Sequence, residues 1–322
     1  MPIWLAIYGA GIDLPSVLDG FTWHVHEMVF GFFSAVLTGF LLTASPNWTG
    51  RKPIAGKLLA SLFLLWLTGR IAMAFGGLLG DGFGPVARLI DVSFLVIVSV
   101  LIWHEILISR NKRNIPVCAL VSLLAIANLV FHAEHLDWLT SDYGVRMGLA
   151  LIAFLITLIG GRVIPAFTRN WMMLNRLEPL PTLFNGFDKM VLAATGLVLL
   201  LWVVDVSDAI SGYGFLLVSG FQLARLARWS GWKTGSEPLV LILHAGYGWL
   251  GVSFLLLGLG LAFPGAVPVS IALHALTAGS VGTMTLAIMS RASLGPSGRP
   301  PNLPPATLLA YIPFSAGAVL PV

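Results

Sequence analysis

Long apolar stretches alternate with short polar segments along nearly the whole chain. An α-helix rises about 1.5 Å per residue, so it needs about 20 mostly apolar residues to cross a hydrocarbon layer about 30 Å thick. The pattern predicts an all-α, polytopic transmembrane helical bundle of about ten spans, forming a single integral-membrane domain over residues 1–322. The ten predicted spans are residues 27–44, 57–79, 86–104, 115–131, 146–163, 189–204, 209–227, 238–263, 267–290 and 306–321.

The composition supports a lipid environment. Hydrophobic residues make up 57% of the chain, charged residues make up 10%, and the mean hydropathy is +0.91, which together exclude an ordinary soluble domain. The single cysteine, Cys118, excludes a disulfide framework and cysteine-rich zinc or iron–sulfur sites. Lys and Arg are scattered over many short loops, so membrane topology explains the net charge of +4 better than a nucleic-acid partner does.

Basic residues divide unevenly between alternate loops. One set of loops contains fifteen Lys and Arg residues, whereas the other contains only Arg88 and Arg146. Because basic residues are retained on the cytoplasmic side, the richer set is predicted to face the cytoplasm and both termini the periplasm, in a bacterial inner membrane. One basic loop follows Gly160, Gly161 and Pro165, which predict the end of the fifth span.

Histidine is the main candidate for chemistry, because ionisable residues in spans usually face the bundle interior and neutral imidazole is a common metal ligand. A lone histidine more often packs, but several at one depth favour a metal site. His104 and His244 lie toward the predicted inner face. Five of the seven histidines lie at or near the predicted outer face: His24, His26, His132, His135 and His274.

The spacing of these histidines refines the prediction. Residues i and i+2 of a helix point about 200° apart, so His24 and His26 share one metal only if that segment is unwound. Otherwise one is a ligand and the other an interfacial residue. Glu134 favours a solvated helix end, and therefore a structural role, for His135. A shared depth near the predicted outer face favours four of these histidines as metal ligands: His24, His26, His132 and His274.

Arg70 is the costliest residue of the chain, because it lies about nine residues inside the outer end of the second span. Asp91 of the third span lies at a similar depth and is its predicted ion-pair partner. A compatible alternative is that Arg70 binds an anionic group such as a haem propionate. Glu27 is predicted to orient a ligating imidazole or to carry protons, or else to be a charge at the water interface.

Five stretches of the chain, in order, resemble the NnrS family of bacterial inner-membrane proteins. The first and the last are long and specific, and together the five span most of the chain. They are WHVHEMVFGFFSAVLTGFLLTASPNWTGR (23–51), RNKRN with the later NLVFH (110–132), IGGRVIPAFTRN (159–170), LHAGYGWLG (243–251) and HALTAGSVGTMTLAIMSRASLG (274–295).

The resemblance implies haem and copper as cofactors, nitric oxide or a related small molecule as a ligand, and action in the nitric oxide response or in protection from nitrosative stress. The family usually has about twelve spans, so the chain is expected to lack the first and the last. Where the family continues with Gly-His-Thr-Gly, residues 295–298 read Gly-Pro-Ser-Gly, so a histidine is lost. The candidate ligands carried over are His24, His26, His132, His244 and His274.

Three functions stay open from the sequence. The first is a haem and copper protein that binds or detoxifies nitric oxide, or protects other metal centres from it. The second is a transporter or permease with a His-, Arg- and Asp-lined pathway. The third is a haem-based sensor or an electron-transfer subunit with an electron donor as partner. No P-loop, GxSxG, HExxH or CxxC motif supports soluble-type nucleotide or nucleophile chemistry.

Overall fold

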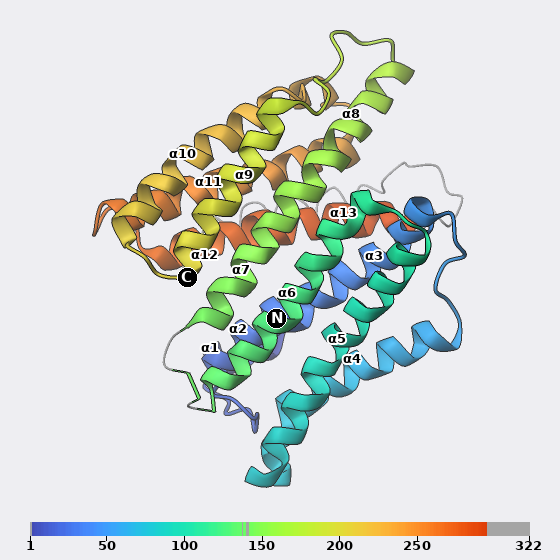
Figure 1. Cartoon of the computed structure of the whole chain (residues 1–322). Helices are drawn as coiled ribbons and strands as arrows, with labels where there is room; N and C mark the ends of the chain where they lie inside the picture. Colours follow the sequence, from blue (N-terminus) through green and yellow to red (C-terminus); the bar gives the residue numbers. More distant parts are fainter. Residues whose placement is uncertain (1, 137, 140–141, 295–322) are drawn as a thin grey trace. The chain divides into compact units, whose positions relative to one another are not determined.

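The structure is a computed structural model that describes residues 2–136, 138–139 and 142–294. All regular structure within these residues is helical, which confirms the prediction of an all-α polytopic bundle (Figure 1). Eight helices of the described residues are long and apolar enough to cross a membrane. They are Gly20–Thr49, Lys57–Leu79, Gly84–Ile108, Lys112–Glu134, Tyr143–Leu174, Gly186–Val203, Pro238–Ala262 and Val269–Arg291.

The other two predicted spans have different outcomes. The predicted span 209–227 is the 20-residue helix α10 (Asp208–Ala227), which is not among the eight because polar residues interrupt its apolar sequence. The predicted span 306–321 and the Gly-Pro-Ser-Gly segment at 295–298 lie outside the described residues. The first span begins at Gly20 and ends at Thr49, so it is longer than predicted at both ends.

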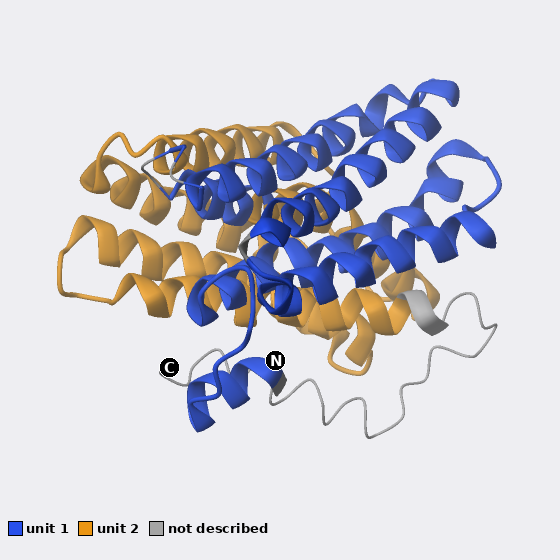
Figure 2. Cartoon of the chain, turned by 90° about the horizontal axis from the view of Figure 1, so that it is seen from below, with its two compact units in different colours: residues 1–151 blue, residues 152–322 orange. Residues whose placement is uncertain are grey.

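Contacts divide the chain into two compact units, residues 1–151 and 152–322 (Figure 2). In unit 1, α5 packs against α3, α4 and α6 around the fully buried side chains of Leu41, Ile102 and Val121. Its elements are α1 (Pro2–Ala10), α2 (Gly20–His26), η1 (Glu27–Phe32), α3 (Phe33–Thr49), α4 (Lys57–Phe75), η2 (Gly76–Leu79), η3 (Asp81–Phe83), α5 (Gly84–Ile108), η4 (Lys112–Asn114), α6 (Ile115–Glu134) and most of α7 (Tyr143–Leu155).

In unit 2, α11 packs against α10, η7 and α13, and α10 also packs against α9. Tyr247, Leu250 and Phe215 are fully or almost fully buried at the centre of this packing. Besides α10, the elements of unit 2 are η5 (Ile156–Gly160), α8 (Gly161–Leu174), α9 (Gly186–Val203), η6 (Gly231–Thr234), α11 (Pro238–Ala262), α12 (Val269–His274), η7 (Ala275–Gly282) and α13 (Thr283–Leu294).

Three spans contain a π-helical segment, namely η1, η5 and η7. A π-helical turn widens the helix, leaves carbonyl groups without their usual partners, and frequently occurs at functional sites. His26 and His274 are the residues immediately before η1 and η7. In η1, the carbonyl oxygen of Gly31 accepts a hydrogen bond from Trp66 Nε1 (2.9 Å). A side chain of α4 therefore stabilises the π-helical turn η1.

The predicted end of the fifth span at Gly160, Gly161 and Pro165 is wrong. The helix continues through Pro165 to Leu174, so Arg162 lies on α8 and not in a loop. Neighbouring groups can satisfy the backbone where a membrane span contains a proline or an irregular turn. Here η5 precedes Pro165, and one of its carbonyl oxygens, that of Thr157, accepts a hydrogen bond from the buried Arg225 Nη1 (2.9 Å).

Candidate metal centre

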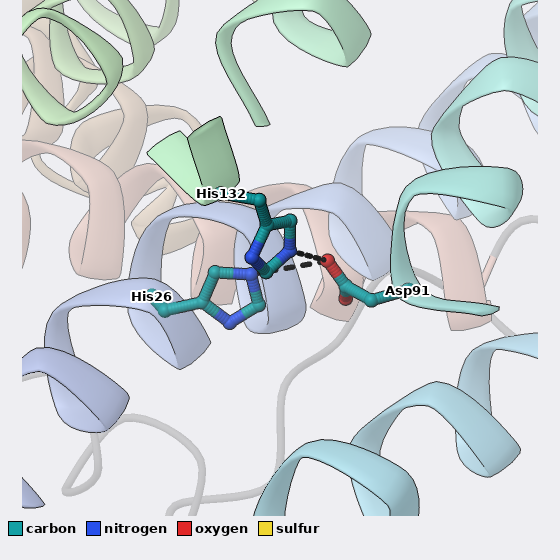
Figure 3. A group of neighbouring side chains, drawn as sticks. All are labelled: His26, Asp91 and His132. Carbon is teal, nitrogen blue, oxygen red and sulfur yellow. Dashed lines mark hydrogen bonds and ion pairs between the residues drawn. The ribbon is translucent and has the colours of Figure 1, made fainter. Parts of the chain in front are cut away.

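Two imidazoles and one carboxylate from three helices of unit 1 meet in the interior of that unit. His26 is the last residue of α2, Asp91 lies on α5, and His132 lies on α6. Their ligand atoms all lie within 4.8 Å of one another, and all three residues are buried. His26 Nε2 and His132 Nε2 lie 3.1 and 2.9 Å from the same oxygen, Asp91 Oδ2 (Figure 3). This geometry brings three potential ligands to one point.

The start of α2 is fixed by an N-cap. Asp19 Oδ1 accepts hydrogen bonds from the backbone amides of Phe21 (3.1 Å) and Thr22 (3.0 Å). Partial burial raises the pKa of the Asp19 carboxyl, but the hydrogen bonds from Thr22 and Phe21 outweigh burial and hold this pKa below its ordinary value. Since the cap defines where α2 begins, it helps to set the direction in which His26 points.

Asp91 is the most heavily contacted group of the centre. Asn128 Nδ2 donates to Asp91 Oδ2 (2.8 Å), alongside the two imidazoles. The other oxygen, Oδ1, forms an ion pair with Arg70 Nη2. Arg70 Nη1 in turn donates to Glu27 Oε1 (2.7 Å). The Asp91 carboxylate is therefore held on both of its oxygens.

The buried charges of this cluster do not balance. Glu27 and Asp91 are both buried carboxylates, whereas Arg70 is their shared cation, so the three groups sum to −1 when the imidazoles are neutral. Arg88, one turn from Asp91 on α5, is half-buried like Arg70 and its Nε is buried, so it is a further cation beside the cluster. The three groups in direct contact therefore carry one excess negative charge, which Arg88 partly offsets.

In unit 1, some of the predicted site residues meet and others lie apart. The Arg70–Asp91 ion pair is confirmed. His26 and His132 lie together, with ring centroids 5.0 Å apart. His24 does not join them, because α2 is helical and points it at Trp4, on which it stacks at 4.2 Å.

The remaining histidines have separate surroundings. In unit 1, His135 Nδ1 donates to the carbonyl of Phe131 (2.8 Å), and the His104 side chain is 57% exposed beside Glu105. In unit 2, His244 Nε2 donates to Thr168 Oγ1 (2.8 Å), and the half-buried His274 donates from Nδ1 to the carbonyl of Ser270 (3.1 Å). Metal ligation by His24, His244 or His274 stays a prediction.

Three features of the centre were missed from the sequence. Asp91 was assigned only to Arg70, yet it also lies against both imidazoles. Asn128 was not singled out, although its position four residues before His132 places both on one helix face. Glu27, predicted to orient a ligating imidazole, lies with Oε1 3.5 Å from His26 Nδ1, but its contact with Arg70 was not predicted.

Unit 2 contains a different buried charged cluster. Arg225, fully buried, donates from Nε to Asp188 Oδ1 (2.8 Å) and from Nη1 to Tyr247 Oη (3.0 Å). Arg228 Nη1 lies 3.5 Å from the other oxygen of Asp188. Here the cationic side chains outnumber the carboxylate. The charged groups of this cluster therefore carry no excess negative charge.

A helical membrane protein with a buried cluster of two imidazoles and a carboxylate is the class that the fold and the site define. The NnrS family model, described as NnrS protein, matches residues 1–322, so the chain belongs to the NnrS family. Membership supports, at the level of the family, a membrane protein of the nitric oxide response. The chain matches no curated protein and no solved structure.

Proposed function

We propose that this protein is a metalloprotein of the bacterial inner membrane that acts in the nitric oxide response or in protection from nitrosative stress, with a copper ion held by His26, Asp91 and His132. The observation that carries the proposal is the convergence of these three buried side chains. Imidazole suits copper, zinc and iron, and a mixed imidazole and carboxylate set is compatible with copper(II). A bound copper ion supplies one-electron chemistry and a binding position for nitric oxide.

The packing of the centre favours a bare ion over a haem. The ring of His26 lies 5.6 Å from that of Phe30 and 5.1 Å from that of Phe131, measured between centroids. Asn128 and Asp91 occupy the hydrogen-bonding positions around its Nε2. A porphyrin needs a flat space on the ligand side of an imidazole, whereas a single ion needs only the convergence of three atoms.

For the haem, we propose His274 as an iron ligand. Its Nδ1–H donates to the carbonyl of Ser270 (3.1 Å), which leaves Nε2 with a lone pair for a metal. A ligating histidine typically donates its other ring N–H to a carboxylate or a backbone carbonyl in this way. His244 fits less well, because Nε2 is bonded to Thr168 and the other nitrogen, Nδ1, lies directly against Gly231, where even a Cβ atom would be only 2.4 Å away.

Metal analysis and the visible spectrum of the purified full chain test these assignments. His26→Ala and His132→Ala should each lose the copper, whereas His104→Ala, which removes an exposed imidazole of the same unit, should keep it. His274→Ala should lose the haem spectrum and keep the copper. Copper that stays bound in both His26→Ala and His132→Ala would contradict the copper site. A wild-type preparation with neither metal would instead support a transporter or permease.

The proposed orientation places both termini in the periplasm. It rests on the fifteen-to-two distribution of Lys and Arg between the two sets of predicted loops. In this orientation, the predicted outer face of unit 1, where α2 begins and α6 ends, is the periplasmic side.

A further inference from the structure

Arg70 connects two carboxylates in the interior of unit 1. Its Nη1 donates to Glu27 Oε1 (2.7 Å), and its Nη2 forms the ion pair with Asp91 Oδ1. The Arg70 side chain is 12% exposed, and those of Glu27 and Asp91 are 10% and 1% exposed. A planar guanidinium can hold two carboxylates in fixed directions, which a lysine ammonium cannot do.

Because of the ion pair with Arg70, the two oxygens of Asp91 have different partners. Oδ1 is occupied by Arg70, whereas Oδ2 alone faces His26 Nε2 and His132 Nε2. Rotation of the carboxylate would break the ion pair with Arg70. The centre therefore offers a cation one carboxylate oxygen and two imidazole nitrogens, and not a chelating pair of oxygens.

The second carboxylate bound by Arg70 reaches the other side of His26. Glu27 Oε1 lies 3.5 Å from His26 Nδ1, while His26 Nε2 lies against Asp91. Asp91, Arg70, Glu27 and His26 thus form a closed ring of polar contacts. Through this ring, Arg70 acts on two of the three proposed ligands without lying among them.

Local packing fixes Arg70 in this position. A Cβ atom at Gly31, inside η1, would lie 2.5 Å from Arg70 Nη1 and 2.7 Å from Glu27 Oε2, so only glycine leaves room for the contact. A Cβ at Gly69, the residue before Arg70, would lie 3.4 Å from the Cα of Asp91, so α4 and α5 approach closely at this level. Trp66, one turn earlier on α4, donates to the carbonyl of Gly31.

We propose that Arg70 is a positioning residue that sets which metal the centre accepts. This inference rests on the proposed metal centre. Calcium and magnesium need several oxygen ligands, whereas copper and zinc are satisfied by imidazole nitrogen and few oxygens. By keeping Oδ1 away from the imidazoles, Arg70 excludes the oxygen-rich coordination that hard cations require and fixes His26 and Asp91 for a nitrogen-binding ion.

The test uses the metal-free full chain in detergent, with Cu²⁺ alone as the probe and the electron paramagnetic resonance spectrum and the dissociation constant as readouts. Arg70→Lys keeps the charge but not the two-directional contact, so it should fold, change the copper spectrum and weaken Cu²⁺ binding by about 10- to 100-fold, as loss of groups that orient metal ligands does. Arg70→Gln should change both readouts at least as much. Arg51→Gln, which breaks the half-exposed pair with Glu105 in the same unit, should leave both unchanged.

The results of these experiments distinguish a failure of the proposed metal centre from a failure of the proposed role of Arg70. A wild-type protein that binds no Cu²⁺ contradicts the proposed metal centre itself. A wild-type protein that binds Cu²⁺, with Arg70→Lys giving the same spectrum and affinity, contradicts the positioning role alone. Size-exclusion chromatography of each variant excludes misfolding as the cause of a loss. If Arg70→Gln does not fold, the Arg70→Lys comparison still decides.

Discussion

The fit between Gly161 and Arg225 in unit 2 can be tested by a double-mutant cycle. Gly161 is the first residue of α8, directly after the π-helical segment η5. A Cβ atom at this position would lie 2.5 Å from Arg225 Cζ and 2.7 Å from Arg225 Nη1. Gly161→Ala should therefore displace the guanidinium from its partners, because Arg225 is fully buried and its hydrogen bonds to Asp188, Thr157 and Tyr247 hold it against this position.

The expected losses in the free energy of unfolding follow from the contacts of Arg225. Breaking a buried ion pair by removing one partner typically costs about 3–5 kcal/mol. Arg225→Ala leaves Asp188 with the 3.5 Å contact to Arg228 as its remaining ion pair and with the hydrogen bond from the Asn185 amide (3.0 Å). Overpacking a buried site costs about 1–3 kcal/mol, so Gly161→Ala alone should destabilise the protein by about 2 kcal/mol or more. With Arg225→Ala already present, the added methyl group has space, and Gly161→Ala should cost almost nothing.

The assay is unfolding in mixed detergent and SDS micelles, which gives the free energy of unfolding of each variant. The expected coupling energy is about 2 kcal/mol, obtained from the wild type, the two single variants and the double variant. Gly220→Ala on α10 is the matched control, because a Cβ there meets no atom within 4 Å. Additive effects of Gly161→Ala and Arg225→Ala would refute the steric argument.

Asp19→Ala should cost about 1 kcal/mol near pH 7 through loss of the N-cap. Because the folded-state pKa of Asp19 is lowered from 3.8, the charge-dependent part of this stabilisation is fully present above 3.8 and is lost as the pH falls through the lowered folded-state pKa. Unfolding at several pH values should therefore show the difference between variant and wild type shrinking in that acidic range. Tyr247→Phe should lower the free energy of unfolding by about 1–3 kcal/mol in the same assay. Gln222 loses a buried hydrogen-bond donor, and Arg225 Nη1 loses one of its two acceptors. An unchanged free energy of unfolding would contradict a stabilising role for these hydrogen bonds. In a Cys118→Ala background, an impermeant thiol reagent added from the periplasm should label a cysteine at position 82 and not one at position 51, and the opposite pattern would reverse the proposed topology.

Sequence alone determined the fold class and most of the spans. Apolar stretches about 20 residues long specify membrane helices because the bilayer offers no partner for an unpaired backbone group. The same reasoning predicted the Arg70–Asp91 pair, since a charge at that depth needs a partner of opposite sign at the same depth. Depth can be counted along a helix, so both results follow from residue numbers.

Only the tertiary structure decided which histidines meet. The sequence left open whether the segment with His24 and His26 is helical or unwound; the structure makes it the helix α2 and stacks His24 on Trp4, away from His26. The local effect of Gly160 and Pro165 was also misjudged, because the π-helical segment η5 and a hydrogen bond from Arg225 let the helix continue. Counting residues gives depth, whereas the direction of a side chain around a helix axis depends on where irregular turns fall and which helices pack beside them.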